Sequence, residues 1–183
     1  MMSSSRLRDA GIAACAAVAL AAAFPKLGAA WIVPFGTAAL FWAWQGASWK
    51  SAAAIGWFSG MIFFAIGFDW IGHTVASYIG PYGPFLMLGP ALVEAPYFAL
   101  AAVLAAVAYR YARPEFAPLA AAAAFAFAEW LRSVGLLGVP FDQLGYTQAG
   151  TPLRAIAAYA GTYGVTFVLC ALGAYLADAI RRR

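Results

Sequence analysis

FAEWLRSVGLLGVPFDQLGYTQAGTPLRAIAAYAGTYGVTF, residues 127–167, is the stretch that decides the fold. Its first residues end an apolar run that also contains Glu129 and Arg132, and its last residues begin another apolar run. Between these runs, residues 138–148 carry glycine, proline, aspartate and glutamine, which do not favour a continuous helix. The pattern predicts two apolar helices joined by a polar, non-helical segment.

Composition extends this pattern to the whole chain. The 183 residues are 65% hydrophobic and 10% charged, and the mean hydropathy is +0.80. Such a chain has too little polar surface to coat a water-soluble globule, so the sequence predicts an integral membrane protein. We expect an all-α fold, a bundle of about six transmembrane helices that forms a single domain over residues 1–183.

Apolar runs and the residues that interrupt them give the expected spans. Proline ends the first run, and glycine, proline and charged residues separate the others. Gly56 and Gly60 have the spacing that lets two helices approach closely in lipid. Pro90 and Pro96 are expected to kink the fourth helix. The six predicted spans are approximately 7–24, 27–44, 51–72, 85–109, 116–131 and 153–177.

The basic residues predict the orientation. An amino terminus in the cytoplasm places eight basic residues inside and three outside, which is the usual bias of membrane proteins. Both termini are then cytoplasmic, and residues 72–83 and 133–152 face outward. The run 11–23 is also typical of a secretory signal peptide, so its cleavage stays open. The inside set is Arg6, Arg8, Lys50, Arg110, Arg113 and Arg181–Arg183, and the outside set is Lys26, Arg132 and Arg154.

No cofactor or nucleic-acid site is indicated. The net charge is +4, but the basic residues gather at the termini and in short loops, a pattern that suits membrane topology better than nucleic acid. Cys15 and Cys170 lie in apolar runs at opposite ends of the chain, and the single His73 gives them no usual metal-ligand spacing. We therefore expect no disulfide, no metal and no other cofactor.

Four ionisable residues within or at the ends of the predicted spans are candidate functional groups, because a charge inside a bilayer costs about 2.5–3.5 kcal/mol on insertion scales. Asp69 stands near the outer end of the third span, as a solvated helix end or as part of a site. Glu94 lies deep in the fourth span and is either structural or faces a substrate. Glu129 and Arg132 share a helix face and form either an ion pair or, through Arg132, a site for a lipid phosphate.

Two other kinds of protein share some of these features. A small proton-coupled transporter would use membrane carboxylates and broken helices, although the chain has no internal repeat to support it. A non-enzymatic membrane scaffold is the further alternative. An intramembrane serine protease is excluded, because Ser59 and His73 lie 14 residues apart on one predicted helix, about 21 Å by helical rise.

Four short motifs resemble a known family. They are Glu129-Trp130-Leu131-Arg132-Ser133, Gly138-Val139-Pro140-Phe141, Gly145-Tyr146-Thr147-Gln148 and Gly161-Thr162-Tyr163-Gly164-Val165-Thr166-Phe167. In this order they resemble the membrane part of the apolipoprotein N-acyltransferases. Two earlier elements, Phe24-Pro25 and Gly67-Phe68-Asp69-Trp70-Ile71, fall where that family has similar ones. The resemblance covers the chain from about Phe24 to its end.

The resemblance implies a bacterial cytoplasmic (inner) membrane protein of lipoprotein maturation. Members of the family transfer an acyl chain from a phospholipid to the N-terminal diacylglyceryl-cysteine of a lipidated apolipoprotein, through a thioester in an outward-facing nitrilase-like domain. The Glu, Lys and Cys of that domain have no counterpart in residues 1–183. We therefore expect a lipid-binding and anchoring part, inactive alone and without catalytic residues, whether through truncation, a split gene or loss of the domain.

The resemblance and the polar positions together give a set of candidate lipid-facing or acceptor-facing residues. The sequence departs from the family pattern at Ser133 and Phe141, and at the charged Asp69, Glu94 and Asp142, which bears on lipid or acceptor preference. The prolines of the fourth span and the uncharged loop before it predict that phospholipid enters between the third and fourth spans. The candidates are Asp69, Trp70, Glu94, Arg132, Pro140, Phe141, Tyr146 and Gln148, and the expected structural ion pair is Glu129 with Arg132.

Overall fold

Helices make up the regular structure of this protein. The computed structural model describes residues 4–24, 27–80, 82–86, 88–134 and 138–182, and over these residues it contains no strand. The predicted all-helical fold of a membrane bundle is confirmed. The elements are α1 (Ser4–Ala22), η1 (Ala30–Ile32), α2 (Val33–Trp44), α3 (Trp49–Gly67), α4 (Asp69–Ile79), α5 (Gly83–Leu86), α6 (Leu88–Tyr111), α7 (Ala117–Ser133), η2 (Leu144–Gln148), η3 (Pro152–Ile156) and α8 (Ala157–Arg181).

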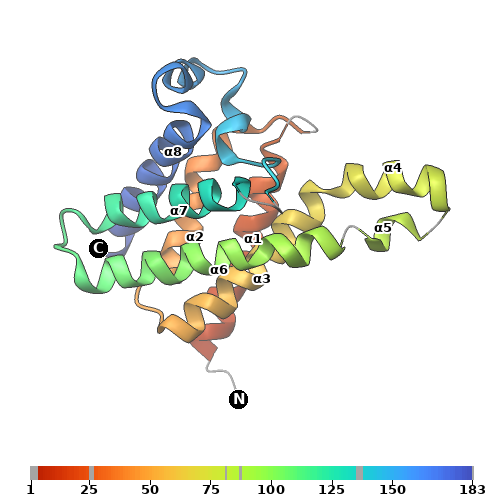
Figure 1. Cartoon of the computed structure of the whole chain (residues 1–183). Helices are drawn as coiled ribbons and strands as arrows, with labels where there is room; N and C mark the ends of the chain where they lie inside the picture. The colour runs from red at the N-terminus through yellow and green to blue at the C-terminus, as the bar shows by residue number, and fades with distance from the viewer. Residues whose placement is uncertain (1–3, 25–26, 81, 87, 135–137, 183) are drawn as a thin grey trace.

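Six of these helices form a closed ring (Figure 1). Neighbours pack in the order α1, α3, α6, α7, α8, α2 and back to α1. Helices α4 and α5 pack against each other and extend away from the ring, to the right of the view. The chain therefore combines a packed bundle with one projecting helical pair.

Aromatic side chains fill the centre of the ring. Phe98 of α6 contacts Phe63 and Phe64 of α3 and Phe125 of α7, with ring centroids 5.1, 5.4 and 5.3 Å apart. Trp44 of α2 stacks on Phe125 at 6.2 Å. All five rings are buried. Because lipid tails are as apolar as these side chains, close van der Waals packing of this kind holds membrane helices together.

Helices α3 and α6 come into close contact at two glycines. A Cβ added at Gly56 would lie 2.6 Å from the Cβ of Ala102, and one added at Gly60 would lie 2.7 Å from the Cβ of Phe98. This close approach is the use that the sequence predicts for both glycines. At these two positions α3 and α6 leave no gap for the phospholipid entry that the sequence predicts between the third and fourth spans.

Helix boundaries differ from the predicted spans in two regions. The second run is divided, because η1 precedes α2 and leaves α2 only 12 residues long. The third span ends at Gly67, and Phe68, with φ −86° and ψ 8°, leads the chain into α4. Residues 73–79, predicted as part of an outer loop, are therefore helical. Asp69 begins α4, where a carboxylate suits the positive end of the helix dipole.

A kink near its start divides α8. Gly161 has φ 63° and ψ −172°, which lies outside the helical region and is accessible to glycine without steric strain. This glycine opens the last of the four family-like motifs. The residues before it therefore follow a different direction from the rest of α8.

Three of the described segments are long and apolar enough to cross a membrane. They are Trp49–Gly67, Leu88–Tyr111 and Pro152–Arg181, while Ala30–Trp44 is apolar but shorter. The remaining ring helices are α1, which carries charges near its start, and α7, which has 17 residues. The number of six spans stays a prediction.

Basic residues gather at one end of the ring, which we name the basic end. Arg181 of α8 donates to the carbonyls of Trp42 and Gln45 at the end of α2. Arg8 of α1 lies 5.0 Å from the Trp42 ring, and Arg182 donates to a carbonyl in the turn between α6 and α7. The starts of α1 and α7 thus meet the ends of α2, α6 and α8.

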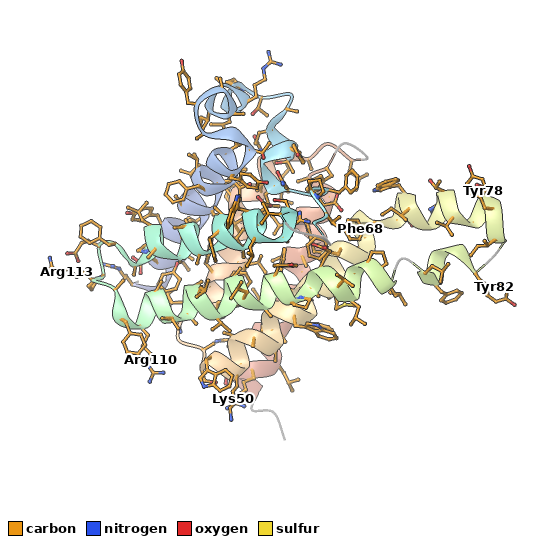
Figure 2. All side chains as sticks on the ribbon, in the orientation of Figure 1. Lys50, Phe68, Tyr78, Tyr82, Arg110 and Arg113 are labelled. Carbon is orange, nitrogen blue, oxygen red and sulfur yellow. The ribbon has the colours of Figure 1, made fainter. Side chains whose placement is uncertain are left out.

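The opposite end carries α4, α5 and the loop between α7 and α8. Figure 2 shows Arg113 at the left, Arg110 at the lower left and Lys50 at the bottom, while Tyr78 and Tyr82 lie at the far right. The predicted orientation, with the basic end in the cytoplasm, stays a prediction. We name this second end the outer end.

Candidate functional site

Arg132, in the last turn of α7, is the centre of a buried polar network at the outer end. Its side chain is 2% exposed and forms a salt bridge of 3.3 Å with Glu94 of α6, which is 0% exposed. The guanidinium donates to the carbonyl of Val139 at 2.8 Å and to the carbonyl of Phe141. It also lies 5.0 Å from the ring of Phe64. One cation thus joins α3, α6, α7 and the segment that follows α7.

Glu129, one turn earlier on α7, has other partners. Its Oε1 accepts from the N–H of Leu144 at 2.7 Å, and its Oε2 accepts from the hydroxyl of Thr166 at 2.5 Å. This corrects the predicted ion pair between Glu129 and Arg132. The two residues share a helix, but Arg132 turns toward α6 while Glu129 turns toward η2 and α8. Backbone and hydroxyl donors satisfy the buried carboxylate there.

Two glutamines fasten the rest of the loop between α7 and α8. Gln143 donates to the hydroxyl of Tyr163 at 3.1 Å and accepts from the hydroxyl of Thr162 at 2.6 Å. Gln148 donates to the carbonyl of Ala30 at 3.0 Å, which links the loop to η1. Both glutamine side chains are buried. The loop is therefore held on α8 at one end and on the α1–α2 connection at the other.

Three of the candidate ligand-facing residues are enclosed in this network. Glu94, Arg132 and Gln148 are 0%, 2% and 3% exposed. The expectation that they face a lipid or an acceptor does not fit this burial, because a ligand would have to displace their protein partners. In this arrangement they position the loop.

The other candidates lie nearer the surface. Trp70 of α4 is 51% exposed and packs edge-on against Phe141, with ring centroids 5.6 Å apart. Pro140 and Tyr146 are exposed on the loop, and Asp69 is partly buried at the start of α4. The structure therefore brings Trp70 and Phe141 together, although 71 residues separate them in the sequence.

A groove of about 970 Å³ opens beside this aromatic pair, and we name it the outer groove. Its walls come from the end of α1, the connection after it, the end of α3 and the start of α4. The volume falls in the usual range for small-molecule sites. The lining is largely apolar, with three titratable side chains, Asp69, His73 and Asp142; the remaining lining residues are Val18, Ala21, Ala22, Phe24, Leu27, Ala65, Ile66, Gly67 and Trp70.

Two parts of this lining escaped the sequence reasoning. His73 was assigned to a loop, but it lies one turn after Asp69 on α4, with its Nδ1 3.3 Å from Asp69 Oδ1. The α1 wall consists of alanine and valine, which carry no signal of a binding site. The alanines of α1 and the polar residues of α4 line the same groove because α4 begins beside the end of α1.

Asp142 reaches the outer groove from the loop with an unusual backbone conformation. Its φ is 55°, a value that aspartate tolerates better than most residues. Its Oδ2 is buried without a hydrogen-bond partner in the described part of the chain. Burial raises the pKa of Asp142 from 3.8 to about 6, although the charge of Arg132 acts in the opposite direction.

Fold and site together define a helical membrane-protein domain whose outer loop is held by a buried ion pair beside an apolar groove. The family model described as "Apolipoprotein N-acyltransferase N-terminal domain" matches residues 16–175. The chain therefore belongs to the apolipoprotein N-acyltransferase family, where it corresponds to the N-terminal domain.

Individual relatives agree with this assignment. An apolipoprotein N-acyltransferase of Methylococcus capsulatus is 33% identical over 161 residues, which cover 86% of this chain and 32% of the relative. One of Pseudomonas aeruginosa is 36% identical over 152 residues, covering 79% of this chain and 29% of the relative. One of Caulobacter vibrioides is 37% identical over 123 residues, 64% of this chain and 22% of the relative. The chain spans a third or less of these proteins.

Removal of the Arg132 guanidinium is expected to unfold the outer end. Arg132→Met should destabilise the protein by about 3–5 kcal/mol, because it leaves Glu94 buried without its cation. Arg154→Met, at an exposed arginine of the same end, is the matched control and should change stability little. Reversible unfolding in mixed detergent measures both variants, and equal stability of the two would contradict the structural role of the pair.

The carboxyl of Asp142 should make the stability depend on pH. Because its folded pKa of about 6 lies above its ordinary value of 3.8, the folded state loses stability as the pH rises through this range. Asp142→Asn keeps the shape and the tolerance of positive φ but removes the charge. The variant should match the wild type below pH 3.8 and melt at a higher temperature above pH 6, and identical melting at both pH values would refute the prediction.

Proposed function

We propose that this chain is the membrane-embedded, lipid-binding and anchoring part of an apolipoprotein N-acyltransferase. The outer groove is the observation that carries the proposal. It lies beside the loop that holds the family-like motifs, and it combines an apolar wall with a polar rim. An amphipathic ligand suits such a site, since its acyl chains meet the wall and its polar part meets the rim.

In the proposed reaction the whole protein transfers an acyl chain from a phospholipid to the N-terminal diacylglyceryl-cysteine of a lipidated apolipoprotein. The thioester step belongs to a nitrilase-like domain with catalytic Glu, Lys and Cys residues. Residues 1–183 do not contain that domain. This activity is proposed for the whole protein, because the relatives are about three times as long as the chain. The membrane part would contribute proximity, which can supply several kcal/mol of rate acceleration.

The lining of the outer groove suggests how a lipid would lie. An acyl chain would pack against the apolar side chains of Ala22 on α1 and Ile66 on α3. The polar part of the lipid would meet Asp69 and His73 on α4. Trp70 supplies an amphipathic ring of the kind found at membrane interfaces.

The proposed location is the bacterial cytoplasmic (inner) membrane, with both termini in the cytoplasm. The distribution of charge supports it, because the described basic residues of the termini and of the α6–α7 turn lie at the basic end. An excess of arginine and lysine favours the cytoplasmic side. The outer groove would then face the outer leaflet, where lipoprotein substrates reside.

A proton-coupled transporter remains the alternative from another class. Its strongest support was the set of membrane carboxylates, and two of these now have structural partners. Glu94 pairs with Arg132, and Glu129 accepts two hydrogen bonds. A carboxylate that fixes a loop is poorly suited to pick up and release protons during transport.

Blocking the outer groove should prevent lipid binding. Val18 lines the groove and is 50% exposed, so Val18→Trp should fill it without displacing the core. We expect a several-fold loss of crosslinking from a phospholipid with a photoactivatable acyl chain, mapped to α1, α3 and α4 by mass spectrometry. Val107→Trp on α6, 42% exposed and outside this groove, is the matched control. Unchanged labelling of the Val18 variant would refute the groove as a lipid site.

The chain alone should form no acyl-enzyme. Cys170 is buried within α8, and Cys15 is exposed on the apolar surface of α1, away from the outer groove. In the described part of the chain no hydrogen bond joins either thiol to a base, and an activated cysteine needs such a partner to form a thioester. Purified protein incubated with radiolabelled phospholipid should retain no hydroxylamine-sensitive label, and such a label on either cysteine would overturn the proposal.

A further inference from the structure

We propose that a second groove, between α1 and α2, binds one anionic phospholipid of the cytoplasmic leaflet. This inner groove has a volume of about 510 Å³ and begins at Arg8, near the basic end. Apart from that arginine, its lining is almost entirely apolar. The lining residues used in the argument are Arg8, Gly11, Cys15, Ala19, Ile32 and Ala39.

The length of the inner groove matches one acyl chain in one leaflet. On α1 its wall runs from Arg8 to Ala19, which is about 16 Å by helical rise. Half of a typical hydrocarbon core is about 15 Å. The other wall runs in the opposite direction, from Ala39 of α2, which is nearer to the Trp42 ring beside Arg8, to Ile32 of η1. A chain in this groove would thus extend from the interface to the middle of the bilayer.

The charge at the shallow end of the inner groove favours an anionic headgroup. The Arg8 guanidinium lies 5.0 Å and the Arg181 guanidinium 5.8 Å from the centre of the Trp42 ring, so two cations flank one indole. Arg8 has Asp9 at 3.6 Å, but the arginine side chain is 64% exposed and keeps donors free for a second anion, since a guanidinium carries five N–H groups. Arg181 donates to carbonyls, and no carboxylate lies within 4.0 Å of it in the described residues. Guanidinium groups bind phosphate through paired hydrogen bonds.

The inner groove lies at the other end of α1 from the outer groove. Its assignment to the cytoplasmic leaflet rests on the proposed orientation, in which the basic end faces the cytoplasm. Basic clusters at that surface attract anionic lipids. A lipid held here would fill the hollow between α1 and α2 and would take no part in acyl transfer.

Photoactivatable lipids test the inner groove directly. The protein is reconstituted in phosphatidylcholine vesicles that contain a trace of phosphatidylglycerol with a diazirine on one acyl chain. We expect this probe to label residues 8–19 and 32–39 about tenfold more than a phosphatidylcholine probe with identical chains, the factor for one charged hydrogen bond. Because both leaflets contain the probe, the result does not depend on orientation.

Two variants separate the groove from the charge. Gly11→Leu should abolish labelling by both probes, because a side chain at Gly11 meets nothing within 4 Å and would occupy the groove. Gly89→Leu, at another helical glycine with open space around it, should leave labelling unchanged. Arg8→Gln should remove the preference for phosphatidylglycerol while acyl-chain labelling persists.

Equal labelling by the two probes in the wild-type protein would overturn the anionic site, and undiminished labelling of Gly11→Leu would overturn the groove. Either failure leaves the proposed function intact if Val18→Trp still blocks lipid binding in the outer groove. Conversely, loss of the Val18→Trp effect with normal labelling of residues 8–19 refutes the proposed function alone.

Discussion

The outer end of this protein depends on the neutralisation of one buried cation. A guanidinium taken from water into an apolar interior loses several kcal/mol of solvation, so the fold must supply an anion and further acceptors at the same place. Glu94 supplies the anion from α6, and the carbonyls of Val139 and Phe141 supply the acceptors. Because these partners come from α6 and from the segment after α7, satisfying Arg132 fixes α6, α7 and that segment relative to one another.

This constraint reaches the outer groove through the backbone. The carbonyl of Phe141 is held by Arg132, while the ring of Phe141 packs against Trp70 of α4. The next residue, Asp142, adopts a positive φ and lines the groove. Glu129 adds a second attachment by accepting from the N–H of Leu144. Buried residues of the family-like motifs, Glu129 and Arg132, thus shape the groove through the backbone that they hold.

Sequence patterns predicted which residues form the helices and the polar loop, but not which side chains pair with one another there. Apolar runs identified the helices, and the small-residue spacing of Gly56 and Gly60 predicted a close helix contact whose partner, α6, only the structure shows. The partner of Arg132 could not be predicted from the sequence, because Glu94 lies 38 residues away and Glu129 is a nearer, equally plausible anion. The break follows Gly67, but a single glycine within an apolar run is common in membrane helices and does not by itself indicate an end, so α4 was predicted as a continuation of the third span and a loop. Its projection from the bundle, which creates the outer groove, is a tertiary effect.

The alanines of α1 allow close helix packing on one face and leave open space on the other. The open space accounts for one wall of each groove. Where α1 faces the ring, Ala13 and Ala17 are fully buried and allow the close approach of α2 and α3. Where α1 faces outward, the same small side chain leaves space that a leucine or phenylalanine would fill. One hollow opens toward the outer end near Ala22, and the other runs from Ala19 toward Arg8 at the basic end. In a membrane such hollows are filled by lipid, because an empty apolar void forfeits van der Waals contacts on one side. An alanine-rich run that resembles a signal peptide in sequence therefore provides, in the folded bundle, a wall of each groove that we propose as a lipid site.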